Sequence, residues 1–224
     1  MKILYLPHAM RNDFYFNLLK SLKKKNSIQV IINPGSEKAY ISILGGEKNI
    51  LIWPNNIEIV NLDLCDEKKK KTKHLINQIE KKSETSINRI FLANERNVGR
   101  AYSRNFYFWN NESHYVRFTN NKNLYNKYLL NLFYFANKFL NLSKPEVVIS
   151  GITSPAMHFA IYLICKLNNI PFLINRKSKV HSSRCYWTTD FNMLNLETEQ
   201  EMKSSIKYNS KLRVIGKNYL KKFR

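Results

Sequence analysis

The residues best suited to chemistry lie in a short segment that follows a predicted strand. Asn94–Arg104 holds one glutamate, one glycine and three arginines within eleven residues. Guanidinium groups bind phosphate or carboxylate through paired hydrogen bonds, and an acidic neighbour such as Glu95 can orient them. The segment therefore predicts an anion site. An internal salt-bridge cluster between Glu95 and its arginines explains the same residues equally well, and both interpretations stay open.

Two further polar segments follow buried strands in the second half of the chain. Gly151–Ser154 precedes an apolar helix, where free backbone N–H groups and a hydroxyl can bind an oxyanion. Asn175–Arg184 follows the next strand and is rich in lysine, arginine and serine. Because adjacent parallel strands end at the same edge of a sheet, we expect these two segments to face each other. An ordinary helix cap beside an ordinary basic loop is the alternative. We favour a ligand site, because packing alone does not explain such a long basic loop beside a capped helix terminus.

A β-α-β unit must position these two segments. Val147–Ser150 and Phe172–Asn175 are predicted buried strands of a parallel sheet, because their apolar residues are continuous rather than alternating. The helix Ala156–Leu167 between them is almost entirely apolar, which is typical of a buried crossover helix. Its His158 is expected to be a satisfied core or cleft-edge histidine rather than a ligand.

The other predicted elements complete one α/β domain over residues 1–224. We expect a Rossmann-like parallel sheet with helices on both faces. The further elements, in chain order, are a strand Lys2–Leu6, a helix from Asp13 to about Lys25, strands Ile28–Ile32 and Ile57–Val60, a charged helix Asp66–Lys82, a strand Arg89–Ala93, a helix Leu124–Leu142, a polar helix from Glu197 to about Tyr208, and a strand Leu212–Ile215.

The charge of the chain predicts an anionic partner without choosing one. Thirty-seven basic residues against 16 acidic ones give a net charge of +21. Nucleic acid, a membrane surface and phosphorylated small molecules all fit such an excess. Much of it lies in lysine runs such as Lys68–Lys71, which we interpret as solvated faces. No aromatic residues are interleaved with the lysines of Asp66–Lys82, so nucleic acid is the less favoured partner.

The sequence lacks the motifs of several familiar sites. It contains no phosphate-binding P-loop, no nucleophile elbow and no H-E-x-x-H zinc motif, and no metal is expected. Three widely spaced cysteines without a C-x-x-C pair indicate neither a disulfide framework nor a zinc site, which fits a reducing cytoplasm. His8 and Arg11 follow the first strand without a glycine-rich dinucleotide motif, and we favour a local structural role for them.

The run KPEVVISGITSPAMHFAIYLICKLNNIPFLINRKSKVHSSRCYWTTD, preceded by NERNVGRAYSRNFYFW, carries a family resemblance. It resembles the N-terminal half of bacterial capsule or surface polysaccharide biosynthesis proteins of glycosyltransferase type. That resemblance implies a GT-B-like Rossmann domain, which binds an acceptor glycan or lipid-linked sugar in a basic cleft. The positions that would line the cleft are Glu95, Arg96, Arg100, Thr153, Ser154, Arg176 and Arg184. Candidates for the catalytic base that accepts the acceptor hydroxyl proton are His8, Glu95 and Asp190.

The resemblance also implies a second, donor-binding domain. The chain stops near the point where that domain would begin, so we expect a truncated reading frame, half of a split enzyme, or a stand-alone acceptor module. No cofactor is expected in this domain, and a nucleotide-sugar donor would bind to the missing domain or to a separate subunit. The expected location is cytoplasmic, with peripheral contact at the inner membrane surface as an option. The alternatives are a basic α/β nucleic-acid-binding protein and a non-catalytic subunit of a polysaccharide assembly complex.

Overall fold

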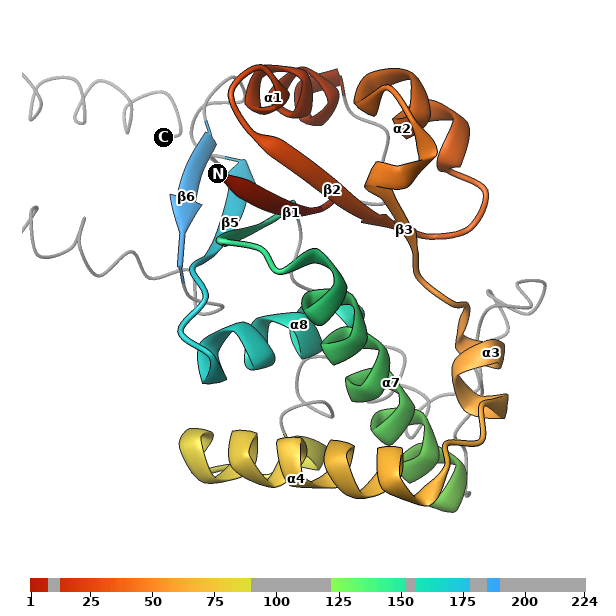
Figure 1. Cartoon of the computed structure of the whole chain (residues 1–224). Coiled ribbons are helices and arrows are strands. Elements are labelled where there is room, and N and C mark those ends of the chain that lie inside the picture. Colours follow the sequence, from red (N-terminus) through yellow and green to blue (C-terminus); the bar gives the residue numbers. More distant parts are fainter. Residues whose placement is uncertain (8–12, 90–121, 152–155, 178–184, 190–224) are drawn as a thin grey trace, which may run out of the picture.

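A computed structural model describes residues 1–7, 13–89, 122–151, 156–177 and 185–189 of the chain, which form an α/β fold around a six-stranded sheet (Figure 1). The strand order is β3-β2-β1-β4-β5-β6, and every neighbouring pair is parallel except β5 and β6. The strands are β1 (Lys2–Leu6), β2 (Ser27–Ile32), β3 (Ile50–Ile52), β4 (Val147–Ser150), β5 (Phe172–Lys177) and β6 (Cys185–Thr188). The helices are α1 (Asp13–Lys23), α2 (Glu37–Leu44), the short 3₁₀ helix η1 (Glu47–Asn49), α3 (Asn56–Asn61), α4 (Asp66–Ser83), α7 (Lys122–Ser143) and α8 (Ala156–Leu167).

Helices cover both faces of the sheet. One face packs on α1 and α2, through residues such as Leu19 and Tyr40. The other face packs on α7 and α8 and forms the larger core, with Phe133 and Ile161 fully buried. Helix α4 lies outside α7 and α8, so this side of the sheet is two helices deep (Figure 1). All four residues of β4 are buried because helices cover both faces of the sheet, as the unbroken apolar run predicted.

The direction of the chain across the sheet reverses between β1 and β4. From β1 the chain moves outward through β2 to β3, and it then returns to place β4 on the other side of β1. β5 continues outward from β4. In open α/β sheets, ligands bind at the carboxyl ends of the strands on either side of such a reversal. The ends of β1 and β4, and of β5 beside them, are therefore the first place to look for a site.

Most of the predicted elements are confirmed. Four predicted strands match β1, β2, β4 and β5, and four predicted helices match α1, α4, α7 and α8. Helix α8 is buried from Ala156 to Cys165, as its apolar composition predicted. The sheet is mainly parallel and covered on both faces, which is the Rossmann-like arrangement expected.

The predicted strand Ile57–Val60 is wrong. These residues belong to helix α3, which begins with a capping box. The Asn55 side chain accepts a hydrogen bond from the Glu58 backbone N–H, and the Glu58 carboxylate accepts one from the Asn55 N–H, both at 2.9 Å. These reciprocal bonds satisfy two backbone donors and start the helix. The strand of this region is instead β3, which begins seven residues earlier in the chain. Helix α2, capped by Gly45 with φ 71°, was not predicted.

Three further predictions of secondary structure need correction, two in the second half of the chain and one in the middle. Strand β6 directly follows the predicted basic loop Asn175–Arg184 and was not predicted, and β5 continues through Arg176 and Lys177, which were predicted to lie in that loop. Arg89, predicted to begin a strand, is helical. The remainder of that strand, residues 90–93, and the predicted elements at 197–208 and 212–215 lie outside the described residues.

Asn131 is a buried polar residue of α7. Its side chain is 1% exposed, and its amide nitrogen donates to the carbonyls of Ile59 at 2.6 Å and Leu62 at 2.8 Å. These carbonyls lie at the carboxyl end of α3, where helical partners run out. Asn131 therefore fixes α3 against α7.

Candidate functional site

Two rows of residues cross the carboxyl edge of the sheet, one on each face. In the first row, Leu6, Ser150, Ile174 and Thr188 are in register across β1, β4, β5 and β6, on the side that packs on α8. The next residues along, Gly151, Asn175 and Trp187, form the second row. Because side chains alternate along a strand, this row faces the side of α1. Gly151 extends the β1–β4 ladder, since its N–H donates to the Leu6 carbonyl at 2.9 Å.

Ser150 and His158 form a buried polar pair in the first row. The Ser150 hydroxyl lies 2.8 Å from the His158 Nδ1 atom, and the two side chains are 0% and 2% exposed. A serine within hydrogen-bond reach of a histidine has the arrangement of a nucleophile and its base. Here neither group is accessible, and the bond ties the first turn of α8 to the end of β4. This confirms the prediction that His158 is a satisfied core histidine.

Asn175 is a buried polar residue whose amide has no partner among the described residues. Its side chain is 2% exposed, and within the described part of the chain neither its amide oxygen nor its amide nitrogen has a hydrogen-bond partner. A buried polar group without a partner costs about 1–3 kcal/mol. Natural proteins satisfy nearly all such groups, and an exception calls for an explanation such as a binding role. Asn175 lies two residues before the end of β5, just beyond the Ser150–Ile174 pair at the carboxyl end of β4, where open α/β sheets bind their ligands.

Thr188 repeats this pattern on the other face. Its hydroxyl is buried, at 1% exposure, and has no hydrogen-bond partner among the residues described. Ile174 lies between Thr188 and Ser150 in the first row. The carboxyl edge therefore has unsatisfied polar groups on both faces of the β5–β6 pair.

Of the residues that the sequence singled out, one lies in a described element. Arg176 follows Asn175 in β5 and pairs with Tyr186 of β6. The other predicted site residues lie outside the described residues: His8, Glu95, Arg96, Arg100, Thr153, Ser154, Arg184 and Asp190. The structure does show that β4 and β5, which precede two of the predicted loops, are adjacent and parallel. Those loops therefore start at the same edge, as predicted.

Asn175, Trp187 and Thr188 were not recognised from the sequence as site residues. A signal for Asn175 exists in the sequence, because this amide directly follows the apolar run Phe172–Ile174 of the predicted strand. Trp187 and Thr188 can be recognised as site candidates only when β6 is known, and the four residues of β6 are too few for a pattern that predicts a strand.

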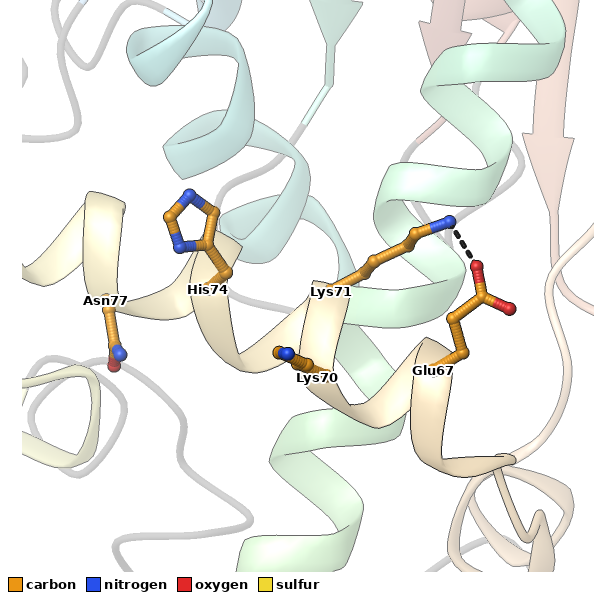
Figure 2. Close-up of a pocket in the computed structure, with 5 residues that line it drawn as sticks. All are labelled: Glu67, Lys70, Lys71, His74 and Asn77. Carbon is orange, nitrogen blue, oxygen red and sulfur yellow. Dashed lines mark hydrogen bonds and ion pairs between the residues drawn. The ribbon is translucent and has the colours of Figure 1, made fainter.

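A surface hollow lies on α4, lined by Glu67, Lys70, Lys71, His74 and Asn77 (Figure 2). All five side chains are exposed. Glu67 and Lys71 point toward each other and form a salt bridge at 2.6 Å, which lowers the pKa of Glu67 and raises that of Lys71. The other side chains fan out from the helix without converging on a point (Figure 2). This is the solvated lysine face that the sequence predicted, and we do not assign a site to it.

Metal sites, membrane-spanning helices and reactive cysteines would point to other kinds of function. The described residues contain no group of three or more metal-ligating side chains, and none of their helices is long and apolar enough to cross a membrane. Cys65 is an exposed free thiol and Cys165 a buried one. Burial raises the pKa of Cys165 to about 12, which makes it an unreactive thiol at neutral pH.

Comparison of the chain with protein-family models, with curated proteins and with solved structures found no match. A functional proposal therefore depends on the chain's own residues and geometry.

Proposed function

We propose that this chain is the acceptor-side domain of a GT-B-like glycosyltransferase in capsule or surface polysaccharide assembly. In this proposal it binds a glycan at the carboxyl edge of its sheet. The observation that carries the proposal is the buried Asn175 amide, which is unpartnered among the described residues and lies on β5, next to the strand β4 that borders the reversal of strand order.

The chemistry of the edge supports a hydroxylated ligand. A carboxamide offers two donors and an acceptor oxygen, and the Thr188 hydroxyl can both donate and accept. Sugar hydroxyls have the same double capacity, so they can satisfy both groups, whereas a simple anion can only accept. The positive charge expected from Arg176 and Arg184 adds affinity for acidic or phosphorylated sugars.

The direction of the strands bears on the choice of catalytic base. β1 ends at Leu6, two residues before His8, and its carboxyl end lies at the proposed ligand edge. β6 is antiparallel to β5, so the chain leaves Thr188 toward the amino end of β5, away from that edge. In our proposal this favours His8 over Asp190 as the group that accepts the hydroxyl proton. Glu95 stays a candidate on sequence grounds.

A binding experiment on the full chain tests the proposal. Isothermal titration with neutral, acidic and phosphorylated oligosaccharides should detect binding, and Arg176→Ala and Arg184→Ala should each weaken binding of the acidic and phosphorylated ones. Lys70→Ala, on the exposed face of α4, is the matched control and should leave affinity unchanged. A chain that binds no saccharide, but binds DNA and RNA with a steep, sequence-independent salt dependence, would overturn the proposal in favour of the nucleic-acid alternative.

A further inference from the structure

Trp187 lies directly opposite Asn175 in the β5–β6 pair. Residues that face each other across an antiparallel pair project on the same side of the sheet, with Cβ atoms about 4.5–5.5 Å apart. Asn175 is 2% exposed and Trp187 is 37% exposed, so the pair runs from the protein interior to its surface. On the other side of Asn175, at the same level, stands Gly151, which has no side chain.

We propose that Trp187 and Asn175 form a subsite for one pyranose ring of a glycan. The proposal deepens the proposed function and rests on it. The indole supplies an apolar face for the C–H face of the sugar ring, while the amide binds the hydroxyls at the rim of the ring. The absent side chain at Gly151 leaves that side of the amide unfilled by its sheet neighbour.

The hydrogen-bonding pattern specifies the ligand further. The amide oxygen of Asn175 accepts from one hydroxyl and the amide nitrogen donates to a second one, so the two hydroxyls must be on neighbouring carbons. A vicinal diol meets this requirement, and a ring whose hydroxyls are blocked at either position does not. Stacking of the sugar ring on Trp187, which is 37% exposed, would change the environment of the indole.

The test uses the full chain and methyl pyranosides, with deoxy and O-methyl derivatives that lack one hydroxyl of each vicinal pair. Tryptophan fluorescence and isothermal titration are the readouts. Binding should change the emission of the wild-type protein, and Trp187→Ala should weaken binding about tenfold or more, with recovery in Trp187→Phe. Asn175→Leu should weaken binding of the parent sugars and abolish the preference for them over the deoxy derivatives. Trp53→Phe, at a buried position in the α7 core, is the control and should keep both affinity and the emission change.

The outcomes separate the subsite from the proposed function. If saccharides bind to the wild-type protein with affinities that Trp187→Ala and Asn175→Leu leave unchanged, the subsite is wrong and the proposed function stands. If no saccharide binds, at millimolar concentration, to pyranoside or oligosaccharide probes, both fail. If mononucleotides change the emission through Trp187 and sugars do not, the stacking site takes a nucleobase, and the assignment to a pyranose is overturned. Circular dichroism of each variant shows whether it remains folded.

Discussion

Replacing Asn175 with leucine is expected to make the empty protein more stable. Leucine has the same branching at Cγ as asparagine but carries no polar atoms. The substitution therefore removes two buried polar atoms that lack partners within the described structure and keeps the number of side-chain heavy atoms, although two methyl groups take up more space than a planar amide. Functional groups held ready for a ligand commonly reduce the stability of a fold in this way. The same change should weaken binding of sugars at the edge.

The size of the effect follows from the cost of an unsatisfied buried amide. That cost is about 1–3 kcal/mol, so we expect the free energy of unfolding to rise by about 1–2 kcal/mol. For a domain of this size, such a gain corresponds to an increase in Tm of about 2–8 °C.

Asn131 supplies a matched control, because it is the same residue type at nearly the same burial. It is 1% exposed, against 2% for Asn175, but its nitrogen donates two hydrogen bonds to the carbonyls of Ile59 and Leu62. Asn131→Leu leaves both carbonyls without this donor and should lower stability by about 2–4 kcal/mol. The two substitutions are thus expected to change stability in opposite directions.

Urea unfolding followed by far-UV circular dichroism measures both variants on the full chain. The comparison is valid if the dependence of free energy on urea concentration is the same in each, because a changed slope indicates a changed denatured or native state. A loss of stability in Asn175→Leu as large as the loss in Asn131→Leu would refute the reasoning, because both substitutions add the same bulk and an equal loss would show that the Asn175 amide is hydrogen bonded in the empty protein. Asn175 would then be a structural residue, and the argument for a ligand at this edge would lose its main support.

Three further outcomes follow from the buried groups. Thr188→Val removes an unpartnered buried hydroxyl and should be neutral or stabilising by up to about 1 kcal/mol in urea unfolding, and a clear loss would show that the hydroxyl is bonded. Ser150→Ala breaks the 2.8 Å bond to His158 and should lower the free energy of unfolding by about 1–3 kcal/mol, whereas an unchanged value would mean that the bond contributes nothing to the fold. Burial raises the pKa of Cys165 from 9.0 to about 12, so the unfolded chain ionises first as pH rises. Stability should therefore fall above pH 9 more steeply in the wild-type chain than in Cys165→Ala, by at most about 1.4 kcal/mol per pH unit, and equal slopes in thermal unfolding would contradict this.

Local pattern was enough to predict elements whose signal is long or strongly periodic. Helix α8 was predicted from twelve nearly all apolar residues, and β4 from a continuous apolar run. The short run Ile57–Val60 misled, because four apolar residues fit a strand and a helix equally well. The nearby pair Asn55 and Glu58 decided in favour of the helix through the capping box, a signal that was present in the sequence and was not used.

The sequence by itself determined that this chain builds a mainly parallel α/β sheet and that polar segments follow its strands, because burial on two faces requires unbroken apolar runs. The tertiary structure alone decided which strands are neighbours, where the strand order reverses, and that β6 returns antiparallel beside β5. Only that return sets Trp187 opposite Asn175. It also decided that Asn131 has partners and Asn175 has none among the described residues, although both are asparagines in apolar surroundings. The physical reason is that hydrogen bonds between distant segments depend on their positions in three dimensions, which no local pattern of residues records.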